Sequence, residues 1–413
     1  MTCSVSDVTS TTLLEPAAFF AADAIQDPYP LYARLRATAP VHCIGDSGFY
    51  VACSYDAIHD VVNRPEDFSS NLTATMTFID GQLGAFEMGE LGGPTNALAT
   101  ADAPAHTVHR KAVLPQLAAK RIRETAPYVA NTFERLWADG IHGDRIEWMG
   151  SVANRLPMMV VARLLGVPDT DVDRLIPWAF AATQTLDGLV TADSLAASTL
   201  AGIEMSGYTF EHFQQAATQP TDNLLGDLAL AQSDGRLDPT AALVIGVTLF
   251  AAGGESTGSM LGSAAELLAT RPDVQRRLRD QPELVSSFIE ETLRYEPPFR
   301  AHYRHVVHDT DLHGVPLPAG SRLLLLWGAA NRDPAQFEAP EEFRLDRRNG
   351  KEHISFGKGP HFCVGAALAR LEASVVLPQL LARTSWIEPV DVGPWLPSIL
   401  VRRRERLELA ITA

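Results

Sequence analysis

Hydrophobic residues recur at three- and four-residue spacing along most of the chain between residues 104 and 300, a pattern typical of amphipathic helices. The pattern predicts successive helices over residues 105–120, 124–139, 152–165, 170–186, 194–216, 224–232 and 239–269. The last of these ranges is the longest and is apolar on most faces. It therefore indicates a helix that runs through the middle of the protein.

Strand-like runs flank this helical region on both sides. They cover residues 41–44, 48–52, 304–312 and 322–327, with turn residues between them. Helix-forming composition returns after Cys363. These elements predict one domain over residues 25–413 that is mainly α with a smaller β part, preceded by a flexible N-terminus over residues 1–24.

Residues 69–100 form an unusual segment that is rich in Gly, Thr, Met and Leu and poor in charge. We find no clear periodicity in it, and a loop of this length is either functional or disordered. Its apolar character argues against disorder, so we expect a lid over an apolar ligand.

Composition narrows the class of protein. The chain is 46% hydrophobic and 20% charged, with a formal net charge of −16, which argues against nucleic acid as a partner. Four scattered cysteines make no disulfide framework, as is typical of a reducing cytosol. The N-terminus lacks the features of a signal peptide, and the longest apolar run, residues 241–252, is too short to span a bilayer. We expect a cytoplasmic protein without a membrane span.

The strongest candidate for chemistry is the loop at residues 355–370, which read SFGKGPHFCVGAALAR. Gly357, Gly359 and Gly365 allow a backbone to approach a flat ligand closely. Cys363 stands just before a predicted helix, where the positive end of the helix dipole favours the thiolate over the thiol. We therefore expect Cys363 to be an axial ligand, whereas the other three cysteines are expected to be small buried hydrophobes or surface bystanders.

This loop meets every fixed position of F-G-x-G-x-H-x-C-x-G-x-x-L-A-R, and through it the chain resembles the cytochrome P-450 superfamily. The resemblance implies the P-450 fold, with haem b between the central helix and the cysteine loop and with Cys363 as the proximal thiolate ligand of the iron. No C-x-x-C-H sequence is present, so the haem is expected to be non-covalent. The residues expected to surround it from this loop are Phe356, Gly357, His361 and Gly365. Residues 71–76 and 327–334 look most like a mycobacterial or related actinobacterial group of soluble members.

A second candidate site lies inside the long predicted helix, where residues 252–257 read AGGEST. Two adjacent glycines cost a helix roughly 1 kcal/mol each relative to alanine. They mark a kink or the close passage of something large, with a simple helix crossing as the competing interpretation. The stretch is similar to the A-G-x-[D/E]-T sequence that lies over the distal face of the haem in the family. The resemblance implies that Glu255 and Ser256 deliver protons to bound oxygen, with Ser256 in place of the usual threonine and Thr257 as a second hydroxyl.

The same stretch supports an alternative, because residues 254–258 also satisfy G-x-S-x-G, the nucleophile elbow of α/β-hydrolases. Ser256 would then be the nucleophile of a serine hydrolase. That motif requires a strand, a turn and a helix within an alternating β/α pattern, which the preceding hundred residues lack. A third interpretation is a non-catalytic haem-binding protein, against which the acid–hydroxyl pair argues.

Charged residues expected around the cysteine loop extend the resemblance to the family. Glu291 and Arg294 match the E-x-x-R pair that braces this loop in the family, where a further arginine completes the network. The matching stretch, residues 340–344, reads PEEFR with glutamate in the arginine position, which leaves Arg344 and Arg347 as alternatives. The cations expected to meet the two haem carboxylates are His106, Arg110, Arg304 and His361. A surface location is the competing interpretation for each of these cations.

The resemblance implies a haem-thiolate monooxygenase that inserts one oxygen atom from O2 into a hydrophobic small-molecule substrate. Electrons are expected from a ferredoxin and its reductase, because the chain carries no flavin or iron–sulfur motif. The basic patch expected to receive the ferredoxin comprises Lys111, Lys120, Arg121, Arg123 and Lys358. The residues expected to line the substrate pocket, by their positions in the family, are Ala251, Ala252, Phe299 and Ile399.

Overall fold

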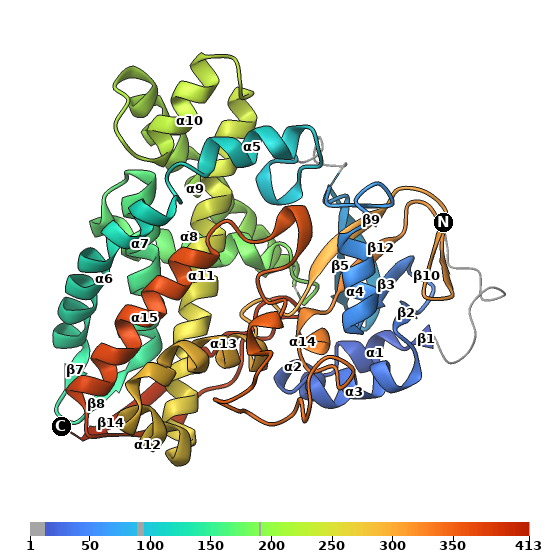
Figure 1. The fold of residues 1–413 in the computed structure, drawn as a ribbon. Helices are drawn as coiled ribbons and strands as arrows, with labels where there is room; N and C mark the ends of the chain where they lie inside the picture. The colour runs from blue at the N-terminus through green and yellow to red at the C-terminus, as the bar shows by residue number, and fades with distance from the viewer. Residues whose placement is uncertain (1–12, 89–94, 190, 413) are drawn as a thin grey trace.

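The computed structural model describes residues 13–88, 95–189 and 191–412. Helices fill one side of the molecule, a sheet with short helices fills the other, and α11 runs between them (Figure 1). The helices of the helical side are α5 (Ala105–Val113), α6 (Ala119–Gly140), α7 (Arg155–Leu165), α8 (Val172–Gln184), α9 (Ala192–Thr218), α10 (Leu224–Ser233), α11 (Pro239–Thr270), α12 (Pro272–Asp280), α13 (Val285–Tyr295) and α15 (Ala366–Arg383). The family fold class expected from the sequence, mainly α with a smaller β part, is thereby observed.

The β side is built on a six-stranded sheet in the order β1-β2-β3-β12-β9-β4. Its strands are β1 (Leu13–Leu14), β2 (Val41–Ile44), β3 (Phe49–Ala52), β4 (Phe68–Ser69), β9 (His302–Val306) and β12 (Arg322–Leu325). The short helices α1 (Pro16–Phe19), α2 (Ala22–Gln26), α3 (Tyr29–Thr38), α4 (Tyr55–Val62) and α14 (Trp327–Ala330) accompany it. Strand β12 pairs parallel with β3 and antiparallel with β9, so that segments far apart in the sequence meet in one sheet.

Three smaller β units complete the described chain. A four-stranded sheet has the order β13-β14-β8-β7, and two hairpins are β5–β6 and β10–β11. Their strands are β5 (Ala74–Ile79), β6 (Gln82–Glu87), β7 (Ile141–His142), β8 (Arg145–Glu147), β10 (Thr310–Leu312), β11 (Val315–Leu317), β13 (Trp386–Val392) and β14 (Leu407–Thr412).

Three predictions from the sequence differ from the structure. Residues 13–24 of the predicted flexible N-terminus are folded: β1 pairs with β2, and Phe19 and Phe20 are buried. Residues 1–12 lie outside the described part. The predicted lid contains the hairpin β5–β6, whose Asp80-Gly81 turn has positive φ at both residues, a hairpin signal that the hydrophobic pattern does not reveal. Residues 89–94 of the predicted lid lie outside the described part. The helix predicted at residues 105–120 is interrupted at Pro115, because proline has no backbone N–H to continue the helical hydrogen bonds.

The two glycines in α11 mark a helix crossing. A Cβ added to Gly253 would lie 2.6 Å from Val161, and one added to Gly254 would lie 2.3 Å from Met158, both on α7. Because these glycines have no side chain, α7 and α11 can pack closely. Helix α11 is long and apolar enough by composition to cross a membrane, but it packs against α7, α8 and α9 inside the protein.

Candidate haem-binding site

The cysteine loop joins a short 3-10 turn to α15 and holds its shape through backbone contacts. Cys363 N–H donates to the carbonyl of Phe356 at 2.9 Å. Gly359 has φ of +71°, and an added Cβ would lie 2.8 Å from the carbonyl oxygen of Val62. Only glycine fits this position, because a side chain would strain the backbone and strike α4.

Cys363 is half-buried by accessible surface, but its thiol is surrounded by enough protein atoms to oppose ionisation. Burial raises the pKa of the thiol, while the backbone N–H groups of Gly365 and Ala366 and the charges of Arg110 and Arg370 act in the opposite direction. The start of the helix therefore acts in the expected direction, toward the thiolate, but desolvation is the larger effect in the protein alone. A bound metal ion would deprotonate the thiol outright.

A buried ionic cluster stands behind this loop. Arg294 is fully buried and donates to both carboxylate oxygens of Glu291, at 2.8 Å from Nε and 2.7 Å from Nη2. Arg347 Nε lies 3.1 Å from each of the same oxygens. Arg344 contributes its backbone N–H at 2.9 Å, while its side chain pairs with the exposed Glu342. The third arginine of the network is therefore Arg347.

The cations expected at the haem carboxylates lie together, on α5, β9 and the cysteine loop. The rings of His106 and His361 stack with centroids 4.0 Å apart. Burial and the neighbouring His106, Arg304 and Arg110 lower the pKa of His361 to about 3. Burial lowers the pKa of Arg304 to about 10, although its side chain is only half-buried by accessible surface. At neutral pH Arg110 and Arg304 carry positive charge, while the two histidines are held neutral and can still donate a ring N–H. Charged and neutral donors grouped in this way are suited to bind anionic groups.

His302 belongs to the same region but was not among the predicted haem-binding residues. The surrounding protein atoms lower the pKa of His302 to about 4, although the residue is exposed by accessible surface. We infer that the surface it exposes faces the inside of the protein and not bulk solvent. The indole Nε1–H of Trp327 donates to its Nδ1 at 2.6 Å. Because indole can only donate, the remaining proton of the neutral ring is on Nε2. No spacing rule identifies such a residue, since Trp327 lies on α14 and His302 on β9.

On α11, Glu255 is almost completely buried and is paired with an arginine from the C-terminal segment. Its Oε1 accepts from Arg403 Nε at 3.1 Å. No described residue makes a hydrogen bond of normal geometry to its Oε2, although the nearby Thr183 hydroxyl favours the charged carboxylate. Burial raises the pKa of Glu255 in spite of this arginine. Ser256 Oγ donates to the carbonyl of Ala252 at 2.6 Å, one turn earlier on the helix. Thr257 is buried, so Ser256 is the better placed hydroxyl.

The predicted pocket residues do not share one environment. Ala252 is exposed and Ala251 half-buried, although α11 runs through the interior. Phe299 is half-buried, with its ring 5.1 Å from that of His302. Ile399 is instead buried in the hydrophobic cluster of the N-terminal segment. Its backbone N–H donates to Asp187 at 3.1 Å, which links the C-terminal segment to the end of α8.

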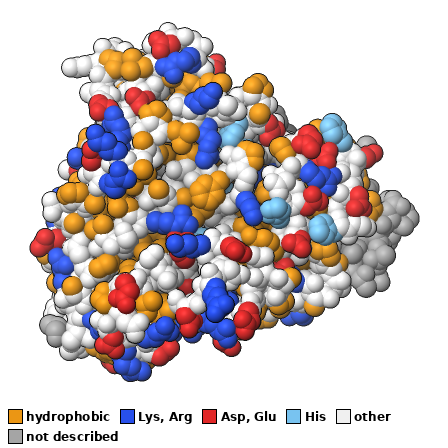
Figure 2. Space-filling model, in the orientation of Figure 1, with side chains coloured by type: hydrophobic (Ala, Val, Ile, Leu, Met, Phe, Trp, Pro, Cys, Tyr) orange, Lys and Arg blue, Asp and Glu red, His pale blue; other side chains and the backbone are white. Residues whose placement is uncertain are grey.

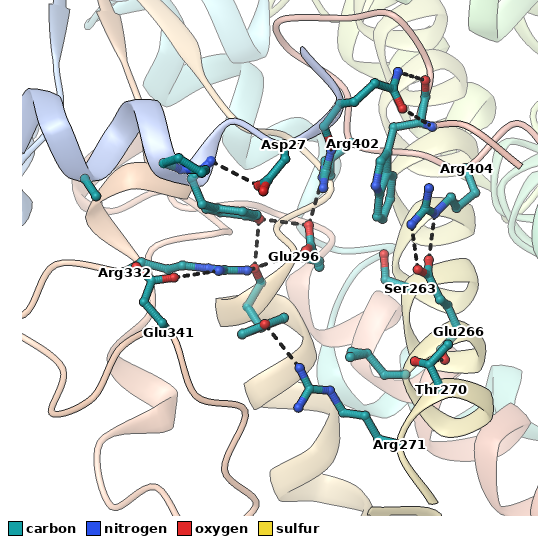
Figure 3. A pocket seen from close by; sticks show the side chains of 17 residues that line it. Asp27, Ser263, Glu266, Thr270, Arg271, Glu296, Arg332, Glu341, Arg402 and Arg404 are labelled. Atoms are coloured by element: carbon teal, nitrogen blue, oxygen red, sulfur yellow. Dashed lines mark hydrogen bonds and ion pairs between the residues drawn. The ribbon is translucent and has the colours of Figure 1, made fainter. Parts of the chain in front are cut away.

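A surface pocket of about 620 Å³ lies elsewhere, between α3, the end of α13 and the second half of α11 (Figure 3). Arg402 and Arg404 of this pocket are neutralised by carboxylates of the pocket itself, Glu296 and Glu266 respectively. Neither the cysteine loop nor the predicted catalytic residues line this pocket. We therefore assign it no part in the chemistry.

The hydrolase alternative is wrong for this fold. Ser256 lies in the middle of a continuous helix and donates to that helix, whereas a nucleophile elbow requires a strand and a sharp turn before the serine. Within the described ranges, no group of three His, Cys, Asp or Glu side chains is arranged to hold a metal ion. The residues present suit haem: one thiol on a shaped loop, with cations nearby for two carboxylates.

Comparisons with known proteins agree with this geometry. A sequence model described as Cytochrome P450 matches residues 205–409. Cytochrome P450 144 from Mycobacterium tuberculosis is 64% identical over 394 residues, covering 95% of this chain and 91% of that protein. A beta-dihydromenaquinone-9 omega-hydroxylase from Mycobacterium bovis is 32% identical over 393 residues, covering 94% of this chain and 76% of that protein.

Solved structures show the same fold over nearly the whole chain. P450BioI, in complex with an acyl carrier protein ligated with hexadec-9Z-enoic acid, superposes with a TM-score of 0.85 at 25% identity, covering 98% of this chain and 100% of that one. CYP109E1 from Bacillus megaterium, in complex with testosterone, gives 0.84 at 27% identity, covering 95% and 99%. The chain belongs to the cytochrome P450 family of haem-thiolate monooxygenases.

Proposed function

We propose that the chain holds haem b through Cys363 and oxidises a hydrophobic small molecule with electrons from a ferredoxin. The observation that carries the proposal is the convergence of the cysteine loop, α5 and β9: the half-buried Cys363 lies near the charged Arg110, and the stacked rings of His106 and His361 lie near Arg110 and Arg304. Cys363 would supply the axial thiolate, and His106, Arg110, Arg304 and His361 would receive the haem carboxylates.

When bound, the haem supplies O2 activation, in which two electrons and two protons lead to one oxygen atom in the substrate and one in water. The chain's own residues supply the surroundings. Glu255 is positioned by Arg403, and no described residue makes a hydrogen bond of normal geometry to its second oxygen, so it can hold or release a proton on the distal side. Ser256 can pass that proton on by exchanging its hydrogen bond to Ala252. The buried faces of α8 and α11 exclude bulk water from this path.

A hydrophobic substrate is supported by the apolar character of the surrounding segments. The hairpin β5–β6 packs against the turn between α8 and α9, where Phe78 N–H donates to the carbonyl of Gly188 at 2.7 Å and its ring stacks on Phe20 at 4.5 Å. This junction would have to move if substrate enters beneath the hairpin. Similar proteins carry names or titles with a menaquinone derivative, a fatty acyl chain and a steroid, all hydrophobic.

The ferredoxin would dock on the face that carries the cysteine loop, and we place the enzyme in the cytoplasm. Figure 2 shows hydrophobic side chains bordered by Lys and Arg side chains near the middle of that face. Phe362, next to the cysteine, is 42% exposed. Within the predicted patch, Lys120 and Arg121 already have carboxylate partners, which leaves Lys111, Arg123 and Lys358 as the main candidates. Reversing their charge should slow reduction in a salt-dependent way; equal rates with every tested ferredoxin would contradict this docking surface.

The test of the cofactor assignment is the absorption spectrum of dithionite-reduced protein with and without carbon monoxide. We expect a strongly red-shifted Soret band from haem with a thiolate ligand, and its loss in Cys363→Ala. Cys53→Ala is the matched control, because Cys53 is buried near α3 and should leave the band unchanged. A band that survives in Cys363→Ala, or no haem binding by the wild-type protein, would overturn the assignment.

A further inference from the structure

A second ion pair lies beside the one that braces the cysteine loop. Glu290 is buried on α13, and Arg370, on α15, donates to both of its carboxylate oxygens, at 2.7 Å from Nε and 2.9 Å from Nη2. This pair is separate from Glu291 and Arg294, which bind each other. The geometry is bidentate, the strongest form of an arginine–carboxylate contact.

His353 adds a third contact without adding charge. Its Nε2 lies 3.2 Å from Glu290 Oε2, and its Nδ1 accepts the backbone N–H of Ser355 at 3.2 Å. Because Nδ1 accepts, the ring proton is on Nε2, and His353 is a neutral donor. Burial opposes ionisation of Glu290, but the hydrogen bonds from His353 and Arg370 outweigh it and lower its pKa to about 2. The cluster therefore holds one negative and one positive charge at neutral pH.

Arg370 connects this cluster to the cysteine loop. Its guanidinium lies over the ring of Phe356, 4.5 Å from the centroid. The carbonyl of Phe356 accepts the N–H of Cys363. The Arg370 side chain is 35% exposed and that of Glu290 only 7%, so both charges are at least partly shielded from water. In such surroundings a charge acts more strongly on its neighbours than it does in water.

We propose that Glu290 and Arg370 are positioning residues that set the reduction potential of the haem iron through their opposite charges. The proposal rests on the proposed ligation of haem by Cys363. One-electron reduction of ferric to ferrous iron, by a reduced ferredoxin or by dithionite, adds one negative charge to the site and makes or breaks no covalent bond. A nearby positive charge favours that reduction and a nearby negative charge opposes it.

The two members of the pair therefore have opposite effects when removed. Glu290→Gln leaves the charge of Arg370 uncompensated and should raise the midpoint potential. Arg370→Gln leaves the charge of Glu290 uncompensated and should lower it. The double variant should return close to the wild-type value. A pair that merely braces the loop would behave differently, because loosening the loop from either side shifts the potential in the same direction.

The test is spectroelectrochemical titration of the haem-loaded full-length protein at fixed pH and ionic strength. We expect each single variant to change the ratio of reduced to oxidised haem at a fixed potential by three- to tenfold, roughly 30–60 mV for a one-electron couple. Glu408→Gln and Arg145→Gln make the same charge changes at an exposed pair between β8 and β14, and should shift the potential less.

Shifts of the same sign in both variants, or shifts no larger than those of the controls, would overturn the proposal. Arg370→Lys keeps the charge and covers the case in which Arg370→Gln fails to fold. The Arg370→Lys variant should keep a midpoint potential close to that of the wild type. A fall in potential as large as the three- to tenfold change expected for Arg370→Gln would count against electrostatic control. The carbon monoxide spectrum separates the two hypotheses: without a thiolate band in the wild type, the cofactor assignment fails rather than the role of this pair.

Discussion

Glu296 offers a sharp test of how the two sides of the molecule are joined. Its carboxylate accepts from Tyr29 Oη at 2.8 Å, Arg402 Nε at 2.8 Å and Arg332 Nη2 at 3.5 Å (Figure 3). These three donors come from α3, the C-terminal segment and the loop after α14. Burial opposes ionisation of Glu296, but the two arginines outweigh it and hold its pKa below the usual value. The group is therefore charged at neutral pH.

Glu296→Ala would leave two arginines whose side chains are only 3% and 5% exposed without their shared counter-ion. Removing one partner of a buried ion pair costs about 3–5 kcal/mol, against a total stability of about 5–15 kcal/mol for a typical protein. We expect a loss in this range, and about half of it for Glu296→Gln, which keeps an acceptor oxygen but loses the charge.

The matched control is Glu341→Gln, which removes the other partner of Arg332. The Glu341 side chain is 53% exposed, and exposed pairs contribute about 0–1 kcal/mol. Urea denaturation followed by circular dichroism and by haem absorbance measures the free energy of unfolding of each variant. Equal losses for Glu296→Ala and Glu341→Gln would refute the argument that burial decides the energy of this network.

Three further predictions concern the haem site. Ser256→Ala should divert electrons to peroxide, measured as peroxide formed per reduced nicotinamide consumed; unchanged coupling with an identified substrate would exclude the relay. Arg347→Gln should speed haem transfer to apomyoglobin several-fold, whereas Arg344→Gln, at an exposed pair, should not; equal rates would contradict the assignment of the third arginine. The pKa of His302 is about 4 in the folded protein and about 6.5 when unfolded, so only the unfolded chain gains this proton as pH falls from 6.5 to 4. The free energy of unfolding should therefore fall over that range, and less steeply in His302→Phe. Urea denaturation at pH 7 and pH 5 measures this change, and an equal change in the wild type and in His302→Phe would show that His302 is not held neutral.

The cysteine loop is the part of the site that was most accessible from the sequence. Its residues are contiguous, and the shape of the loop depends on local features such as the positive φ of Gly359 and the helix that begins at Ala366. The long helices were predicted for the same reason, because a repeating apolar face is a property of neighbouring residues. Even here the pattern had limits: a proline divided one predicted helix, and the hairpin of the predicted lid was missed.

The sequence by itself determined the family and the helical core and predicted the cysteine ligand, because all three are encoded at short range. Tertiary structure alone decided which arginine completes the Glu291 network, because the spacing in the sequence does not separate Arg344 from Arg347. The path of the loop after Phe343 brings the guanidinium of Arg347 to Glu291, whereas Arg344 reaches it only with its backbone N–H. It also decided that Glu255 pairs with Arg403, far along the chain. Such contacts depend on how distant segments pack, and burial then sets their charge state, because the cost of desolvation exists only once the chain has folded.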